Sequence, residues 1–178
     1  MSQIAPCRGM VFEITGLLIL FHVLFASLWF GGAVYQVRVV GGTLMQAGPA
    51  ASGFMLALAR RGGIGKYFAV MGALTIVFGG IVYGQEKVSD HAFDMAGGFL
   101  WLTLGAIMAV LAYLHGLLVQ LPTERKWLAV CNGVKGAPTK EQGEQMMALG
   151  MKLGKGGAVS TAMIGVAMLL MLMHQVLV

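Results

Sequence analysis

The four histidines of this 178-residue chain are the side chains best suited to chemistry. His22, His115 and His174 lie in long apolar segments, and His91 lies between two such segments. An ionisable side chain is costly inside a bilayer, so an intramembrane histidine is a candidate functional residue by default. Two imidazoles can hold a haem iron from opposite faces. The pattern therefore predicts a tetrapyrrole site, most simply haem b, with His22 as first ligand and His174 as its preferred partner.

The depth of each histidine indicates which of them could share a site. At about 1.5 Å per helical residue, His22 lies roughly 12 Å and His174 roughly 6 Å from the same outer boundary of the membrane. His115 lies about 24 Å from that boundary, near the opposite interface. We therefore expect His22 and His174 to face one another. His115 would be an interfacial anchor or would hydrogen-bond a quinone.

Aromatic and small side chains recur on the helix face of His22. Phe25, Ala26 and Trp29 follow it at helical spacing and could form the wall of a flat macrocycle. The alternative for each histidine is a hydrogen bond to a carbonyl or hydroxyl group of a neighbouring helix. In that case the chain would be a non-catalytic structural subunit of a respiratory or photosynthetic complex.

Methionines in the last apolar segment raise copper as a third possibility. Met163, Met171 and His174 share one face of that segment, and thioether and imidazole groups suit Cu(I). The chain has 14 methionines, but methionine also fills gaps in ordinary apolar packing. The candidate metal ligands are thus His22, His174 and Met171.

Four apolar segments must position these side chains. Hydrophobic residues make up 58% of the chain and charged residues 11%, which is too few to cover a soluble surface. A helix of about 20 apolar residues crosses the hydrocarbon core of a membrane. The sequence therefore predicts a single all-α domain, residues 1–178, folded as an integral membrane four-helix bundle. Its helices would cover about residues 14–34, 67–83, 99–121 and 158–178.

Basic residues are concentrated in the first and third connections between these segments. The two connections hold four and six Lys or Arg residues, ten of the 12 in the chain. The positive-inside rule then places both connections in the cytoplasm and both termini outside (N-out/C-out), in a bacterial inner membrane. The same rule explains the net charge of +5 without a nucleic-acid partner. The expected partners are the lipid bilayer and other membrane subunits.

Amphipathic stretches and small residues predict local structure. Residues 49–61 and a stretch capped by Thr139 read as short interfacial helices within the basic connections. Pro122 would close the third membrane helix. Small residues predict close helix packing, which we expect inside the bundle, with dimerisation through these faces as the alternative. The small residues are Gly80 and Gly84 in one segment, and Gly105, Ala109, Ala112 and Gly116 in another.

Sequence signatures of soluble catalysis do not occur in this chain. It has no phosphate-binding loop, no Ser-His-Asp order, no Cys-x-x-Cys and no His-Glu-x-x-His. We therefore do not expect the chain to be an enzyme by itself.

The first apolar segment carries one family resemblance. It reads His22-Val-Leu-Phe-Ala-Ser-Leu-Trp29-Phe-Gly-Gly32. This is similar to the opening helix of bacterial CopD-type copper-resistance membrane proteins, in which a His precedes a Trp-x-Gly-Gly motif. The apolar, Met-bearing end at His174 is also similar. The resemblance covers the first helix and, loosely, the four-span layout. It implies a small bundle in which His22, and less firmly His174, handles copper or haem, although copper importers of this type usually have more spans.

Overall fold

The computed structural model describes residues 5–47, 52–61, 63–85 and 98–177, and every regular element within them is a helix. Two of the elements are π-helical turns, written η1 and η4. In chain order the elements are α1 (Ala5–Tyr35), η1 (Gln36–Gly41), α2 (Gly42–Ala47), α3 (Ser52–Arg61), α4 (Ile64–Gln85), α5 (Phe99–His115), η4 (Gly116–Gln120), α6 (Leu121–Gly133) and α7 (Lys140–Leu177).

These elements form four long helices, because α1, η1 and α2 are continuous, as are α5, η4 and α6. Each of the four is long and apolar enough to cross a membrane. The predicted all-α four-helix membrane bundle is therefore confirmed, and the chain is a multi-pass membrane protein. No membrane-spanning helix carries more than two charged residues in its most apolar 18-residue window.

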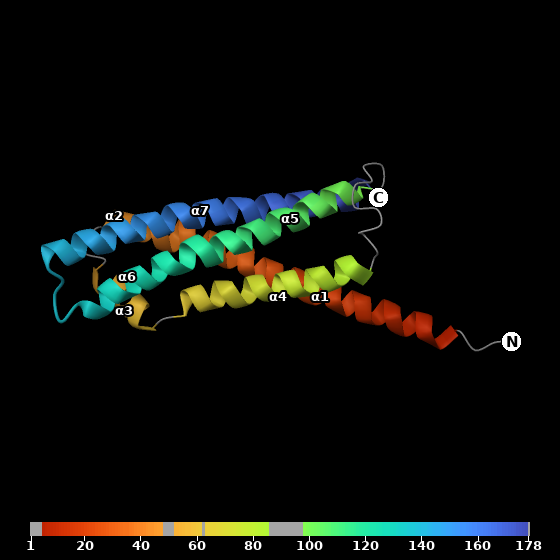
Figure 1. Cartoon of the computed structure of the whole chain (residues 1–178), viewed down its shortest axis with the longest axis horizontal. Coiled ribbons are helices and arrows are strands. Elements are labelled where there is room, and N and C mark those ends of the chain that lie inside the picture. The colour runs from red at the N-terminus through yellow and green to blue at the C-terminus, as the bar shows by residue number, and fades with distance from the viewer. Residues whose placement is uncertain (1–4, 48–51, 62, 86–97, 178) are drawn as a thin grey trace.

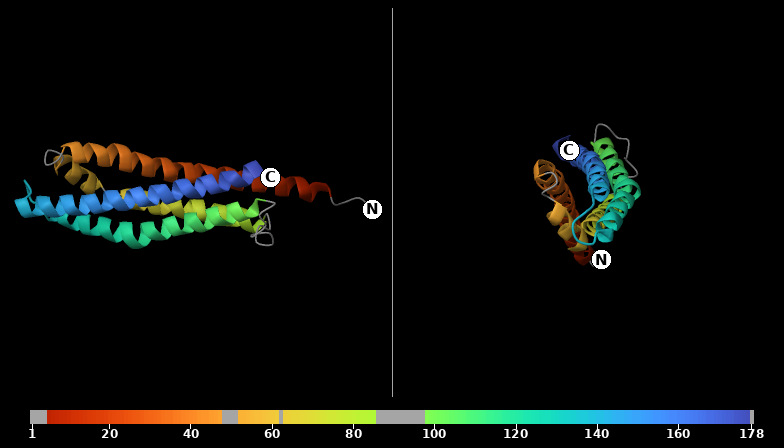
Figure 2. Two further views of the ribbon diagram at one scale, coloured as in Figure 1. Left: turned by 90° about the horizontal axis from the view of Figure 1, so that it is seen from above. Right: turned by 90° about the vertical axis from the view of Figure 1, so that its left-hand side faces the viewer.

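The bundle consists of two closely packed helix pairs. The most extensive contacts join α1 to α4 and α5 to α7 (Figures 1 and 2). Both chain ends lie at one end of the bundle, and α3 and the α6–α7 connection lie at the other (Figure 1). The end with α3 is called the basic end below, because it carries exposed basic residues. These residues include Arg61, Lys66, Arg125, Lys126, Lys135 and Lys140. That this end faces the cytoplasm stays a prediction from the positive-inside rule.

Three of the four helices extend far beyond the predicted spans. The 22 residues of α4 rise about 33 Å, which matches the hydrocarbon core. The 38 residues of α7 rise about 57 Å, so this helix projects from the membrane at the basic end. The interfacial helix expected after Thr139 is in fact the first part of α7. Thr139 caps it as predicted, because its Oγ1 accepts a hydrogen bond from the backbone N–H of Gln142 at 3.2 Å. In return, the side-chain Oε1 of Gln142 accepts a hydrogen bond from the backbone N–H of Thr139 at 3.0 Å.

Pro122 does not close the third membrane helix as predicted. A proline inside a helix lacks an N–H, and its ring crowds the carbonyl of the preceding turn. Here the preceding turn is the π-helical η4, and Pro122 occupies the first turn of α6, which continues to Gly133. The wider π-helical turn accommodates the proline ring. The backbone therefore stays helical at a position where regular α-helical hydrogen bonding would be interrupted.

Two buried clusters hold the helices together. The membrane cluster joins α1, α5 and α7 and contains Trp29, Ala33, Ala112 and Ile164. The basic-end cluster joins α3, α6, the following turn and α7, and contains Leu56, Trp127, Cys131, Val134 and Met146. The second cluster explains the helix extensions, because it gives their amphipathic faces a surface on which to pack outside the lipid. Cys131 is fully buried within it.

The glycines show which predicted small-residue faces pack inside the bundle. Gly105 and Ala112 are buried, and a Cβ at Gly105 would meet Met171 and the carbonyl of Ala167 on α7. This confirms a close α5–α7 contact. Gly80 and Gly84 are exposed, and a Cβ at either would have no atom within 4 Å. The expected bundle-packing role of that pair is therefore wrong.

Candidate functional site

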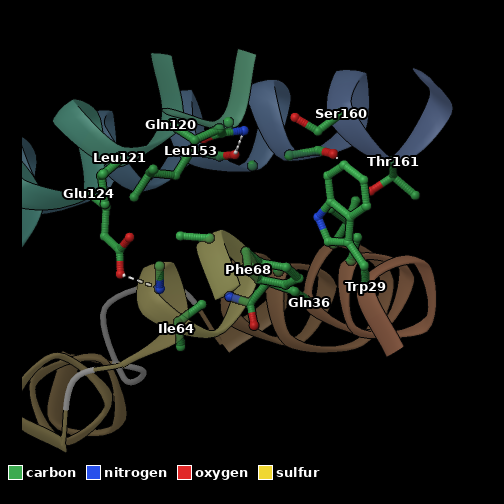
Figure 3. A pocket seen from close by; sticks show the side chains of 18 of the residues that line it. Trp29, Gln36, Ile64, Phe68, Gln120, Leu121, Glu124, Leu153, Ser160 and Thr161 are labelled. Carbon is green, nitrogen blue, oxygen red and sulfur yellow. Dashed lines mark hydrogen bonds between the residues drawn. The ribbon is translucent and has the colours of Figure 1, made fainter. Parts of the chain in front are cut away.

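One cavity of the described chain lies where the two buried clusters meet. Its volume is about 220 Å³, and residues from all four long helices and from α3 line it (Figure 3). Trp29 of the membrane cluster and Trp127 of the basic-end cluster both belong to its wall. Phe68 and Tyr113 add two further aromatic rings. The cavity thus extends from the membrane interior toward the basic end.

Both π-helical turns contribute to the wall of this cavity. Gln36, Val37 and Gly41 come from η1, whereas Gly116 and Gln120 come from η4. A π-helical turn costs regular helical bonding and is found frequently at functional sites. Two such turns on one cavity therefore mark it as the candidate site. The sequence alone did not predict this cavity. The one signal in the sequence was a glutamine at the end of the first and of the third apolar segment, Gln36 and Gln120.

Glu124 closes the basic end of the cavity. Its Oε1 accepts a hydrogen bond from the backbone N–H of Gly65 at 3.0 Å, in the first turn of α4 (Figure 3). A carboxylate is stabilised at this position because the N-terminus of a helix carries partial positive charge. Gly65 must lack a side chain, since a Cβ there would collide with the carboxyl group of Glu124. This contact joins α6 to α4 and so links the two helix pairs.

Several polar atoms of the cavity already have partners. Thr161 Oγ1 donates to the Gly157 carbonyl at 2.8 Å, and Gln120 Nε2 approaches the Leu153 carbonyl at 3.4 Å. Trp127 differs, because its Nε1 is buried and has no hydrogen-bond partner among the described residues. An unsatisfied buried donor costs about 1–3 kcal/mol.

His22 lies between α1 and α4 and outside this cavity. Its Nδ1 is 2.9 Å from the Thr75 carbonyl, so Nδ1 carries the hydrogen and donates it. Its ring packs against Gly79, where a Cβ would lie 2.6 Å from the ring Cε1. This is the interhelical hydrogen bond that the packing alternative predicts. It also leaves Nε2 as the atom of His22 available to a ligand.

His174 has a different set of neighbours from His22. Its ring packs against Phe99 of α5, with centroids 5.1 Å apart, and its Nδ1 is buried without a partner in the described chain. The outer ends of α1 and α7 lie apart (Figure 1). The structure therefore places the two histidines in separate helix pairs and does not bring them together. Neither of them lines the cavity.

The other predicted site residues divide between the cavity and ordinary packing. Trp29 lines the cavity and meets Tyr113 edge-on, at an interplanar angle of 81°. His115 lies behind the wall, with its Nδ1 2.8 Å from the hydroxyl of Ser160, which lines the cavity. Met171 packs beside Gly105. His91 lies outside the described residues. Among the residues that the structure describes, no three His, Cys, Asp or Glu side chains group as a metal site.

Comparisons of the chain with protein-family models, with curated proteins and with solved structures find no match. The similarity of the first helix to CopD-type proteins therefore stays a prediction from the sequence.

Proposed function

We propose that this chain is a small multi-pass subunit of a bacterial inner membrane that binds a lipid-soluble molecule between its four helices. The observation that supports this most directly is a cavity of about 220 Å³ between the four helices, with both π-helical turns in its wall. Pockets lined mainly by apolar side chains, with a few polar groups among them, are the usual places for small ligands. Binding there would make the chain an accessory or redox subunit of a larger membrane complex.

Filling the cavity tests this proposal, because two glycines of the bundle form a matched pair. A Cβ at either Gly116 or Gly80 would have no atom within 4 Å, but only Gly116 lines the cavity. We expect Gly116→Leu to block the site and Gly80→Leu to leave it open. The probe is a long-chain alcohol carrying a photoreactive diazirine, added to the protein in lipid nanodiscs. After irradiation, mass spectrometry would map the labelled peptides.

The expected result is labelling of cavity-lining peptides around Gln36 and Ser160 in the wild type and in Gly80→Leu. In Gly116→Leu this labelling should fall by about tenfold, while labelling of lipid-facing positions such as Leu20 stays unchanged. Equal labelling of the cavity peptides in all three proteins would overturn the proposal.

Haem b binding is a second candidate, favoured by the free Nε2 of His22. A metal-ligating histidine generally donates its other ring N–H to a carbonyl or carboxylate, as His22 does to Thr75. The donor chemistry of His22 therefore fits an axial ligand. The positions do not fit a shared site with His174, which packs in the other helix pair, so we assign no bis-histidine geometry. Among the residues that the structure describes, copper handling is supported only by the residue types of Met171 and His174.

Optical spectroscopy separates the haem candidate from the cavity proposal. If His22 ligates haem, the protein purified in mild detergent should show a Soret band, with sharp α and β bands after dithionite reduction. His22→Ala should lose these bands, and His115→Ala should keep them because His115 bonds Ser160 elsewhere in the bundle. A featureless wild-type spectrum would remove haem and leave the cavity proposal standing.

A further inference from the structure

A second cavity of the described chain lies where residues of α1, η1, α3 and α4 meet, and it is called the corner cleft below. Its volume is about 450 Å³, and it is open to the surface of the protein. Its wall includes Gly32, Tyr35, Gln36, Arg61, Ile64 and Tyr67. We infer that the corner cleft binds the phosphate head group of an anionic phospholipid. This site is separate from the cavity between the four helices and does not depend on the function proposed for it.

The corner cleft lies at the level of the phospholipid head groups. Ile64 begins α4, whose 22 residues rise about 33 Å and therefore match the hydrocarbon core. Tyr35 ends α1, directly after the first span predicted from the sequence, residues 14–34. Tyr35 and Tyr67 are both exposed, and tyrosine is enriched where lipid meets water. A group bound in the corner cleft would therefore lie at the boundary between hydrocarbon and water.

Arg61 determines the charge of the corner cleft. It is the one charged side chain among the described residues of the wall. Lys66, in the first turn of α4, adds a second exposed cation close to it in the chain. Glu124 contacts the same turn of α4, but it lines the cavity between the four helices and accepts a hydrogen bond from the backbone N–H of Gly65. The charge of the corner cleft therefore complements an anion.

The polar groups of the wall suit a phosphate. The guanidinium of Arg61 offers a planar fork of N–H donors, which matches the spacing of phosphate oxygens. The hydroxyl of Tyr35 and the amide of Gln36 are two further donors in the same wall. The hydroxyl of Tyr67 is already engaged, because it donates to the Leu28 carbonyl at 2.8 Å. Basic pockets between membrane helices are sites at which anionic lipid head groups bind.

The membrane side of the corner cleft offers a surface to acyl chains. Gly32 allows Tyr67 to pack closely against α1, since a Cβ at Gly32 would lie 2.9 Å from Cε1 of Tyr67. One turn further into the membrane, Leu28 and Val70 are exposed on the helix faces that carry Gly32 and Tyr67. A phospholipid held by its head group would lay its acyl chains along these side chains. Free phosphate gains nothing from this apolar surface, so the occupant is a lipid.

Removing the charge of Arg61 tests the assignment. Arg61→Gln deletes the guanidinium, and Arg125→Gln makes the same change at an exposed arginine of α6, at the same end of the bundle and outside the corner cleft. Phosphatidylglycerol would be titrated into each protein in detergent micelles, and bound lipid would be measured by native mass spectrometry. We expect Arg61→Gln to weaken binding by about fivefold, the upper range for one exposed ion pair, and Arg125→Gln to bind like the wild type.

Two further comparisons identify the lipid and the role of the guanidinium. Wild type should bind phosphatidylglycerol more tightly than phosphatidylcholine, because the ammonium group of choline is repelled by Arg61 and Lys66. Arg61→Lys keeps the charge but loses the planar fork, so its affinity should lie between those of wild type and Arg61→Gln. An excess of inorganic phosphate should displace the lipid no more than sodium chloride of equal ionic strength does, because phosphate has no acyl chains.

Each part of the inference has an outcome that contradicts it. Wild-type affinity in Arg61→Gln, or equal weakening in Arg61→Gln and Arg125→Gln, would overturn the site. Tighter binding of phosphatidylcholine would overturn the anionic head group, and displacement by phosphate beyond the chloride control would overturn the lipid. Because Arg61 is exposed, Arg61→Gln should unfold at the same detergent concentration as the wild type. Gly116 does not line the corner cleft, so the diazirine experiment on Gly116→Leu succeeds or fails independently of these outcomes.

Discussion

Replacing Trp29 with alanine is expected to destabilise the bundle by about 3–5 kcal/mol, the usual cost of removing a large buried aromatic side chain. Trp29 is 5% exposed and is the largest residue of the membrane cluster. Its ring meets Tyr113 edge-on at 6.2 Å and lies against Gly72 of α4. It thus contacts α4 and α5, and it shares the membrane cluster with Ile164 of α7. Its loss would enlarge a cavity that is already present, and long helices fixed at several contacts cannot close that space.

The buried thiol of Cys131 provides the measurement. Wild type and variants would carry Cys7→Ser, so that Cys131 is the one remaining cysteine. Reaction of Cys131 with a maleimide dye, followed as sodium dodecyl sulfate is added to mixed micelles, reports the unfolded fraction, because the folded protein hides this thiol completely. Leu20→Ala is the control, since Leu20 is 61% exposed on the same helix. Equal losses of stability in the two variants would show that Trp29 is not at the centre of the bundle.

Introducing leucine at Gly105 is expected to cost about 1–3 kcal/mol, the typical cost of overpacking a well-filled interface. A Cβ at this position would lie 2.8 Å from Met171 Cγ and 3.0 Å from the Ala167 carbonyl oxygen. A flexible methionine can move aside, but a backbone carbonyl moves only if α7 moves. The substitution should therefore separate α5 from α7. This pair and the α1–α4 pair are the two most closely packed helix pairs of the bundle.

Gly84→Leu is the matched control for Gly105→Leu. A Cβ at Gly84 has no atom within 4 Å, and leucine favours a helix more than glycine does. The same detergent titration, now followed by the far-ultraviolet circular dichroism of the helices, should show a lower midpoint for Gly105→Leu only. An unchanged midpoint for Gly105→Leu would contradict the close α5–α7 approach.

The membrane spans could be predicted from the sequence because lipid imposes a simple requirement. A segment that crosses hydrocarbon must satisfy its backbone internally and expose apolar side chains, so hydropathy and length identify it. Beyond the lipid the requirement changes. Around Arg38 and Glu124 the sequence is amphipathic and resembles a solvated connection, yet helix formation there is stabilised by burial of Trp127, Cys131 and Met146. That burial depends on α3, α6 and α7 together, and it cannot be deduced from any one segment.

The candidate cavity was beyond sequence reasoning for a related reason. Gly65 and Glu124 are 59 residues apart, and their contact becomes visible only when the helix pairs are placed side by side. The histidines illustrate the opposite difficulty. The depth of each histidine along its helix could be calculated, but the direction in which its side chain points could not. In the structure His22 hydrogen-bonds Thr75 on α4, whereas His174 packs beside Phe99 on α5. Depth alone could not decide whether two imidazoles share a site.

The short length of α4 has a consequence for the behaviour of the protein in different membranes. The other three helices continue past the lipid, but α4 is tied at both boundaries, by Glu124 at Gly65 and by the Thr15 hydroxyl, which bonds Gln85 Oε1 at 3.2 Å. A bilayer thinner or thicker than about 33 Å must therefore tilt α4 or deform around it, at a modest cost for each ångström of hydrophobic mismatch. Because Gly65 stands at the edge of the cavity, tilting of α4 would alter the opening between the helix pairs. Bilayer thickness would then act directly on the entrance to the site.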